Sequence, residues 1–348
     1  MRPKENKLAL STTFLPETFP HVRKTGIEVL TSFSEAIGRD VMLTQGSTGN
    51  TSIKIGGVLW IKASGTWLQD AGHRPTFVAL DLARARDCVW RTDSMTAAVL
   101  PEGPPGLQPS IESGMHAVLP HRVVAHIHSV HAIAAAVCAR PQQVLQDRLS
   151  GISWEWIPYV PSGLPLACQV MRAVERSGEA NVFVLGNHGL TVCGNTVGEV
   201  ESLIYRVHDA LAVPPRAAPP VDASGLQDLA AASGWILPDR PIIHSLAMDP
   251  ASRSILSRGV LYPCQEIFLG GSRAWNTFAT DPADTALPFL IVPERGVLIS
   301  PRMTTAEYLT LAGLAEIVQR INPSAPLNYL SEQQVTAARA LGNYKSQG

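Results

Sequence analysis

Apolar positions along the chain change repeatedly from a helical spacing to an alternating one. Residues 21–37 place Ile27, Leu30, Phe33 and Ile37 at intervals that share one face, which predicts an amphipathic helix. The short runs TSIKI, VLWIKA and TFVALDL follow, and glycine-rich turns surround the first two. These runs predict three strands after the first helix.

The same mixture of periods continues up to the middle of the chain. We predict a helix over residues 111–119, a strand over 122–130 and an alanine-rich helix over 131–139. A strand near residues 154–160 precedes a turn and a further helix. NVFVLGNHGLTVCG then predicts a strand, a turn and a second strand, and residues 196–212 predict a strongly periodic helix. This interleaving indicates α/β layers.

A proline-rich segment, VPPRAAPPVDASG, interrupts the pattern. We therefore predict a first domain over residues 1–213, a linker over residues 214–225 and a small α+β extension over residues 226–348. Within the extension, RGVLYPCQEIFLG and PFLIVPERGVLIS look like strands, and residues 304–320 predict a helix.

Composition and charge narrow the class of protein. The 348 residues are 45% hydrophobic and 16% charged, as in a globular protein, with a formal net charge of −1. That balance gives no electrostatic footprint for nucleic acid or for an anionic membrane surface. No apolar run approaches the roughly 18–20 residues of a transmembrane helix. We expect neither nucleic acid nor membrane as a partner.

Cysteine usage and the N-terminal segment indicate a cytoplasmic protein. The five cysteines are dispersed without a C-x-x-C spacing, which is typical of reduced thiols. The opening segment MRPKENKLALSTTFLPE lacks a continuous apolar stretch long enough for a signal peptide.

The stretch VVAHIHSVHA holds three of the ten histidines. On a strand, His126 and His128 point to the same face, and two imidazoles so placed can bind one zinc ion. A catalytic zinc site needs a third protein ligand and an open position for substrate. Taken alone, the pair is weak evidence for a metal, and strand histidines held by ordinary hydrogen bonds are the preferred interpretation.

Two further residues strengthen the hypothesis of a metal site. His188 follows an apolar strand on a turn flanked by Gly186 and Gly189, where glycines display a polar residue. In GLQPSIESGMH, Glu112 lies in the first turn of a predicted helix capped by Ser110, four residues before His116. Its carboxylate suits a metal ligand or a general base, or simply a partner of the helix dipole.

Two glycine-rich turns supply candidate anion-binding amides. They are GSTGNTS (residues 46–52) and KASGT (residues 62–66), and Lys54 or Lys62 could add a positive charge. Each turn alone is also typical of an ordinary hairpin.

The order of these motifs resembles the class II aldolase/adducin family over residues 29–213. The resemblance implies an α/β fold, a class II aldolase-like three-layer α/β/α sandwich with a mixed, largely antiparallel central sheet. It also implies a homotetramer with active sites at subunit interfaces. Zn²⁺, or another divalent metal, would be held by His126, His128 and His188.

The resemblance assigns further roles around that metal. Glu112 matches the catalytic acid/base of the family's aldolases, and proton transfer works best if an apolar pocket raises its pKa. The positions that match substrate- and phosphate-binding residues are Asn50, Ser64, Gly65 and Ser110. Ile111 departs from the pattern, because phosphate-binding members often carry a second serine there. His131 matches a variable position and is not carried over as a ligand.

A subgroup of the family is most similar, namely the aldolase part of rhamnulose-1-phosphate aldolase/short-chain dehydrogenase fusions. WIPYVPSGLPLA, GVLYPCQEIFLG and the terminal YLSEQQVTAARALGNY carry this likeness. No G-x-G-x-x-G follows a predicted strand, so no dehydrogenase half is expected within these residues.

The implied function is that of a zinc-dependent lyase of carbohydrate metabolism. It would cleave or form a C–C bond of a small ketose or sugar phosphate by retro-aldol chemistry through a metal-stabilised enediolate. A metal-dependent decarboxylase of a 3-oxo acid and a ribulose-phosphate-type epimerase use the same ligands and stay open, and a non-catalytic adducin-like interaction module is a further alternative. Tyr159, Tyr205 and Tyr262 are candidates for the acid that this family often takes from a neighbouring subunit, but none lies in a matching motif, and packing in the core or at an interface is the preferred interpretation of each.

Overall fold

The computed structural model describes residues 20–178, 180–270 and 287–345. Residues 1–19, from which no signal peptide is expected, lie outside this described part. The domain boundaries near residues 213 and 225 remain predictions from the sequence.

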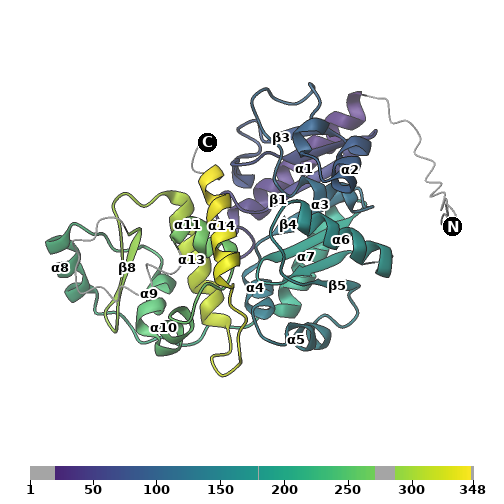
Figure 1. Cartoon of the computed structure of the whole chain (residues 1–348). Coiled ribbons are helices and arrows are strands. Elements are labelled where there is room, and N and C mark those ends of the chain that lie inside the picture. Colours follow the sequence, from purple (N-terminus) through teal and green to yellow (C-terminus); the bar gives the residue numbers. More distant parts are fainter. Residues whose placement is uncertain (1–19, 179, 271–286, 346–348) are drawn as a thin grey trace.

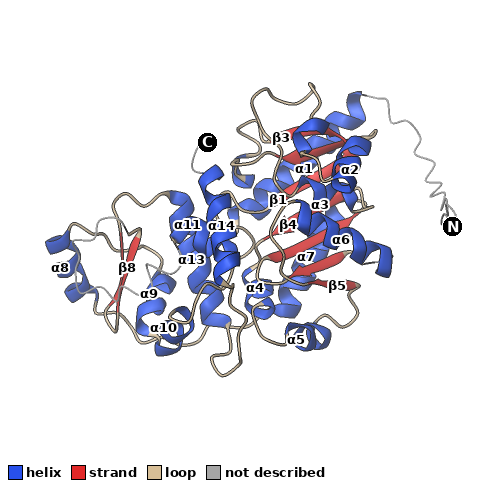
Figure 2. Ribbon diagram, in the orientation of Figure 1, coloured by secondary structure: helices blue, strands red, loops and turns tan. Residues whose placement is uncertain are grey.

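A mixed seven-stranded sheet forms the centre of the N-terminal half in the described structure (Figure 2). Its strand order is β3-β2-β1-β4-β7-β6-β5, and only the β5–β6 pairing among these neighbours is parallel. The strands are β1 (Asn50–Ile55), β2 (Val58–Lys62), β3 (Phe77–Asp81), β4 (Val123–Ile127), β5 (Trp154–Ile157), β6 (Val182–Leu185) and β7 (Gly189–Gly194).

Helices cover both faces of this sheet. One face carries α1 (Pro20–Arg39), α4 (Val130–Ala136), α5 (Pro141–Arg148) and α7 (Val197–Leu211). The other carries α2 (Leu82–Arg91), α3 (Ser113–Val118) and α6 (Leu164–Ser177). Short 3₁₀ turns occupy Leu68–Asp70 and Met95–Ala98. The three-layer α/β/α sandwich with a mostly antiparallel sheet confirms the fold expected from the sequence.

Strand β4 shows why the sheet is covered on both sides. Val123, Ala125 and Ile127 belong to the apolar cluster that includes α1 and α7. Val124 points to the opposite cluster, in which Met115 of α3 is fully buried. Because every second residue faces the other layer, a strand buried on both faces reads as a nearly continuous apolar run. His126 stands out in such a run.

The C-terminal part combines helices with a two-stranded hairpin. Its elements are α8 (Ala223–Ser233), α9 (Pro241–Met248), α10 (Pro250–Leu256), α11 (Pro263–Leu269), β8 (Phe289–Val292), β9 (Gly296–Ile299), α13 (Thr305–Arg320) and α14 (Glu332–Lys345). Figure 1 shows α11, α13 and α14 between the large sheet and β8. One apolar cluster joins Val130 and Ile133 of α4 to Leu311 and Leu314 of α13. The two halves therefore share a core.

One element differs in type from the sequence prediction. RGVLYPCQEIFLG was expected to be a strand, but residues Pro263–Leu269 form helix α11. Pro263 occupies the start of the helix, where its missing N–H costs nothing, and Gly270 ends it in the left-handed conformation at φ 69°. A segment this short, with mostly buried residues, shows no clear period and fits either element, so the surroundings decided it.

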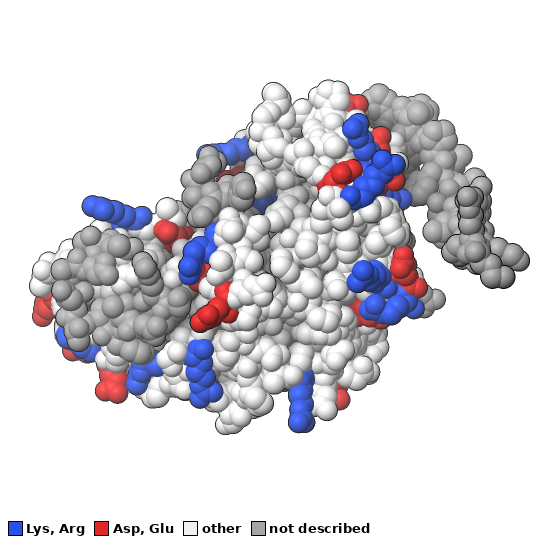
Figure 3. Space-filling model, viewed as in Figure 1, with Lys and Arg blue, Asp and Glu red and all other residues white. Residues whose placement is uncertain are grey.

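The surface agrees with the balanced composition. On the face drawn in Figure 3, basic and acidic side chains alternate in small groups. Among the described residues, no helix combines the length and the apolar character that a membrane crossing requires.

Candidate active site

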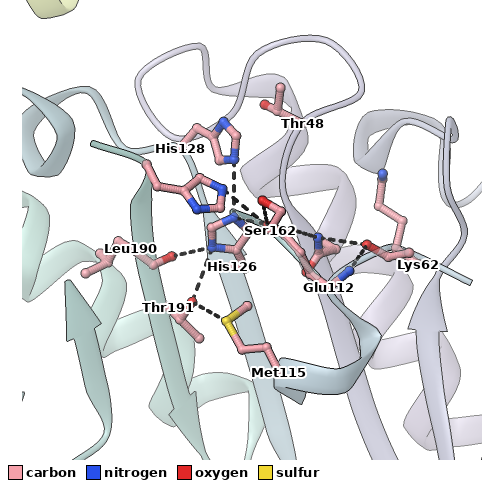
Figure 4. Close-up of polar contacts among 12 residues, drawn as sticks. Thr48, Lys62, Glu112, Met115, His126, His128, Ser162, Leu190 and Thr191 are labelled. Atoms are coloured by element: carbon pink, nitrogen blue, oxygen red, sulfur yellow. Dashed lines mark hydrogen bonds and ion pairs between the residues drawn. The ribbon is translucent and has the colours of Figure 1, made fainter. Parts of the chain in front are cut away.

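Three imidazole rings converge beside the carboxyl ends of the inner strands β4 and β6 of the large sheet (Figure 4). His126 lies on β4, His128 directly follows that strand, and His188 lies on the turn between β6 and β7. One ring nitrogen from each histidine lies within 4.8 Å of those of the other two, and all three side chains are buried. The Nε2 atoms of His126 and His128 are 3.2 Å apart. The expected strand over residues 122–130 ends earlier, at Ile127, but the two rings still meet.

The far sides of two rings have partners in the protein. The Nδ1 atom of His126 lies 3.2 Å from the Leu190 carbonyl oxygen and 3.2 Å from Thr191 Oγ1. Because a carbonyl only accepts, the hydrogen bond to Leu190 places the His126 proton on Nδ1 and leaves a lone pair on Nε2. The Nδ1 atom of His128 lies 3.5 Å from Cys264 Sγ. Such contacts fix the ring orientation that a metal ligand needs.

The backbone around His188 tolerates few substitutions. A Cβ on Gly189 would lie 2.5 Å from the carbonyl oxygen of Ile127, and a Cβ on Gly186 would lie 2.9 Å from the amide nitrogen of Tyr159. Asn187 adopts a left-handed conformation at φ 50°. Glycine and asparagine are the residues that accept such close approaches and dihedrals. Gly186, Asn187 and Gly189 therefore meet the backbone requirements of the turn that carries His188.

Glu112 lies against the histidine cluster with both carboxylate oxygens engaged. Its Oε1 is 3.2 Å from His188 Nε2 and its Oε2 is 3.5 Å from His126 Nε2. Asn50 Nδ2 donates to Oε2 at 2.8 Å, and Ser162 Oγ donates to Oε1 at 3.1 Å. The carboxylate is thus held in one orientation from two sides.

The pKa of Glu112 is shifted downward, whereas a raised pKa would favour a general acid. Burial alone would raise the carboxyl pKa, but the electrostatic influence of His126, His188 and His128, together with a hydrogen bond from His188, outweighs it and holds the pKa well below its usual value. At neutral pH Glu112 is a carboxylate, and it is suited to accepting a proton.

Helix α3 begins later than the sequence predicted. Its first residue is Ser113, and Glu112 occupies the position before it, with φ −95°. Ser110 does not cap this helix, although its hydroxyl accepts from the Glu112 amide at 3.3 Å. His116 lies apart from the histidine cluster, with Nδ1 2.7 Å from Ser52 Oγ, and burial is the main reason that its pKa is lowered.

A cavity of about 250 Å³ opens onto Glu112, His128 and His188. His126 is fully buried beneath it. The structure brings all four predicted substrate- and phosphate-binding residues to its wall: Asn50, Ser64, Gly65 and Ser110. Ile111 also lines the cavity and is 37% exposed. An apolar side chain therefore stands where phosphate-binding members of the resembled family often carry a second serine.

Of the two lysines that could add a positive charge beside the glycine-rich turns, one lies at the cavity and the other does not. Lys62 lines the cavity, and its Nζ donates to the Ser47 carbonyl at 3.0 Å. Lys54 is buried elsewhere and donates to the carbonyls of Leu119 and His121.

Some residues at the site carried no clear signal in the sequence. Ser162 follows the Pro161 turn and reaches Glu112 across the cavity. Tyr159 lines the cavity, whereas Tyr262 is fully buried and Tyr205 is exposed on α7. Tyr159 is one of the three tyrosines that the sequence offered as candidate acids, and of these three it is the one that lines the cavity.

His131, the third histidine of the opening run, points elsewhere. It lies on α4, its Nδ1 accepts from the Val213 amide at 3.4 Å, and its ring contacts that of His208 at a centroid distance of 4.6 Å.

Comparison with known proteins places these features in a family. Residues 32–213 match the model of the class II aldolase and adducin N-terminal domain. The uncharacterized oxidoreductase YuxG of Bacillus subtilis (strain 168) is 29% identical in an alignment of 188 positions, which covers 49% of this chain and 27% of that protein. The chain thus spans about a quarter of that relative.

Two solved structures are also similar. The N-terminal class II aldolase domain of a conserved protein from Thermoplasma acidophilum is 25% identical, with a TM-score of 0.46, covering 53% of this chain and 91% of that one. A sugar-phosphate aldolase from Thermotoga maritima is 14% identical, with a TM-score of 0.42, covering 55% and 93%. Because the family model matches more than half of the residues, the chain belongs to the class II aldolase and adducin family.

Proposed function

We propose that this protein is a metal-dependent carbon–carbon lyase that cleaves or forms a bond in a small ketose or sugar phosphate. One observation carries the proposal: three buried imidazoles meet the carboxyl group of Glu112 beside a cavity of about 250 Å³. Membership of a family that includes metal-dependent aldolases supports it.

The donor set fits a divalent metal such as Zn²⁺. Three imidazole nitrogens from His126, His128 and His188 lie close enough together to share one ion, and three protein ligands leave a position for substrate. When bound, the metal would supply Lewis-acid stabilisation of negative charge on a substrate oxygen. The contact between His126 Nδ1 and the Leu190 carbonyl holds the ring ready for that role.

Glu112 serves as the base in this proposal. In the cleavage direction it accepts the proton of the substrate hydroxyl next to the bond that breaks, and that oxygen becomes the aldehyde carbonyl. The electron pair of the broken bond stays on the other carbon, which later takes up a proton. Tyr159 is our candidate for that donor, because burial, followed by the influence of Cys264, raises its pKa to about 12 and keeps it protonated.

The polar wall of the cavity is proposed to hold the substrate phosphate. Lys62 brings a positive charge, Ser64 and Ser110 bring hydroxyls, and Gly65 has φ 75° with open space where a Cβ would lie. Exposed amides and hydroxyls beside a lysine are typical of phosphate recognition. Ile111 limits the number of donors, so the anion is bound by fewer groups than two adjacent serines would provide.

A metal-replete screen tests the proposal. Purified protein is loaded with Zn²⁺, its metal content is measured, and sugar phosphates and 3-oxo acids are assayed for released aldehyde and carbon dioxide. We expect about one metal per chain and aldehyde release that a chelator abolishes. Carbon dioxide without aldehyde would identify a decarboxylase, an epimerised product without either would identify an epimerase, and a protein that takes up no metal would identify an interaction module.

We also propose the tetrameric assembly that the resemblance implies. Light scattering of the purified protein measures it directly, and a monomeric mass would contradict it.

A further inference from the structure

A second cavity lies where the two halves of the chain meet. Its volume is about 650 Å³, within the range of small-molecule sites, and no described residue lines both this cavity and the one at the imidazoles. Its walls come from α4 and α5, from the segment after α7, and from residues 319–326 at and beyond the end of α13. A ligand bound here therefore contacts both halves.

The lining of this second cavity has an unbalanced charge. Its four charged side chains are all basic, and no aspartate or glutamate among the described residues lines it: Arg140, Arg148, Arg216 and Arg320. A cavity lined by charge of one sign attracts ligands of the opposite sign.

Two of these arginines have no carboxylate partner in the described part of the chain. Arg216 and Arg320 each form an ion pair with a carboxylate. The Arg148 guanidinium instead donates to two backbone carbonyls at the end of α7, at 3.3 and 3.4 Å. The Arg140 guanidinium has no ion pair or hydrogen bond with a described residue. Arg140 and Arg148 thus bring two uncompensated positive charges to the cavity.

Arg320 adds an unused hydrogen-bond donor. Its side chain is 10% exposed, and its Nη1 donates to the Glu316 carboxylate. Its Nε is buried and has no hydrogen-bond partner among the described residues. Because a buried donor without a partner is costly, an acceptor that enters the cavity gains from meeting this atom.

The pKa of His131 shows that Arg148 and Arg320 act on the same end of the cavity. Burial lowers this pKa to about 4, and His208, Arg320 and Arg148 lower it further, while Asp209 acts in the other direction. His131 lines the cavity and is neutral at neutral pH. The positive potential at this end therefore comes from the arginines.

Helix α5 separates the two uncompensated charges. Arg140 directly precedes the helix and Arg148 is its last residue, so a rise of 1.5 Å per residue puts their Cα atoms about 12 Å apart. Arg140, Val144 and Arg148 recur every four residues along one face, and all three line the cavity. No side chain caps the first turn of α5, and its exposed amides add to the attraction for an anion beside Arg140.

We propose that this cavity binds a small organic molecule that carries an anionic group, phosphate or carboxylate, at each end. Arg140 and the first turn of α5 hold one group, and Arg148 with Arg320 holds the other. Guanidinium groups bind both kinds of anion through paired hydrogen bonds. Val144 packs against the carbon atoms between the two groups. This site requires neither the metal nor the proposed lyase reaction.

Calorimetry with ligands matched in length tests the proposal. Fructose 1,6-bisphosphate and suberate each place six carbon atoms between two anionic groups, and fructose 6-phosphate and heptanoate lack one of those groups. At least one two-ended ligand should bind about tenfold or more tightly than its one-ended counterpart. The pair that shows this preference identifies the anion as phosphate or carboxylate. No preference in either pair would overturn the proposal.

Substitution of the exposed Arg140 tests where the ligand binds. Arg140→Gln should reduce the preference for the two-ended ligand at least about tenfold, and Arg140→Lys, which keeps the charge, should retain part of it. Arg206→Gln is the matched control, because Arg206 is exposed on α7 and does not line the cavity. An unchanged preference in Arg140→Gln, or an equal loss in Arg206→Gln, would refute the assignment.

A separate variant tests binding at the cavity beside the imidazoles. Lys62→Gln removes the positive charge from that wall and should leave the preference for the two-ended ligand unchanged. If Lys62→Gln abolishes the preference and Arg140→Gln does not, the ligand binds beside the imidazoles and the proposal is wrong. Aldehyde release by a protein that shows no such preference would keep the proposed lyase and remove this second site.

Hydrogen exchange measured by mass spectrometry gives a location that does not depend on any substitution. The bound two-ended ligand should slow amide exchange in peptides that cover residues 140–148 and 319–326, which form opposite walls of the cavity. Protection of neither peptide at a saturating ligand concentration would overturn the proposal.

Discussion

Asn50 holds the carboxylate of Glu112, although 62 positions separate them in the chain. The amide of this β1 residue donates to Oε2 at 2.8 Å, while Ser162 donates to Oε1. The Asn50 Oδ1 atom is buried and has no hydrogen-bond partner among the described residues, and the residue lines the cavity. A buried acceptor without a partner is costly, so this oxygen is well placed to accept from a substrate hydroxyl.

Replacing the carboxylate should separate binding from catalysis. Glu112→Gln preserves the size of the side chain but removes the charge that accepts the proton. We expect zinc content to stay near that of the unsubstituted protein and kcat/KM for aldehyde release to fall by about 10²–10⁴-fold. Elemental analysis and steady-state assays measure the two quantities. Glu102→Gln, at an exposed position, is the control, and a Glu112→Gln enzyme of full activity would rule out the role.

Removing one imidazole of the cluster should remove the metal. His188→Ala takes away one of three ligand atoms, so we expect metal content and activity to be lost together. His131→Ala is the matched control, because that buried histidine belongs to the same short run as His126 but faces His208 instead. A His188→Ala protein with a full complement of zinc would contradict the assignment.

Asn187 should act on the metal through the backbone of its neighbour. Asn187→Ala removes two hydrogen bonds to carbonyls of the C-terminal part and places alanine at φ 50°. We expect the free energy of unfolding to fall by about 2–4 kcal/mol, together with weaker zinc binding. Urea denaturation and zinc titration measure both.

Asn187→Gly serves as the comparison for that variant. Glycine adopts this backbone conformation without strain but also loses the two hydrogen bonds. The free energy of unfolding of Asn187→Gly should therefore lie between those of the unsubstituted protein and Asn187→Ala. Zinc affinity that is unchanged in both variants would show that the turn holds His188 without this anchor.

Lys54 should make stability depend on pH. Burial lowers the pKa of Lys54 from 10.5 to about 7, and the positive charge of Arg86 contributes to this shift. Cys193 acts in the other direction. Between about pH 7 and pH 10.5, Lys54 binds more protons in the unfolded chain than in the folded one. Its contribution to the free energy of unfolding therefore rises with pH over this interval. Below pH 7 the full penalty for the buried charge is present.

Comparison with Lys54→Met isolates this contribution. The free energy of unfolding of the unsubstituted protein minus that of the variant should increase from about pH 7 to pH 10. Chemical denaturation at a series of pH values gives this difference. A difference that stays constant or decreases over the interval would refute the pKa direction.

The sequence by itself determined the family and most elements of the N-terminal half. Periodicity separated helices from strands there because the sheet is buried on both sides and its helices on one. The motifs around Asn50, Ser64, Ser110, Glu112 and His188 were readable because their constraints are local, as the glycines beside His188 show. Chemistry that needs a tight turn leaves a short, recognisable pattern.

Only the tertiary structure decided what lies opposite those motifs. Residues 263–269 fold as a helix and not a strand, because so short a segment carries no clear period and packing sets its form. Ser162, Cys264 and Asn187 act through partners 50 to 141 positions away, and no local pattern encodes such pairs. The direction of the Glu112 pKa also depends on three imidazoles that meet only in the folded chain, since electrostatic coupling follows distance in space and not in sequence.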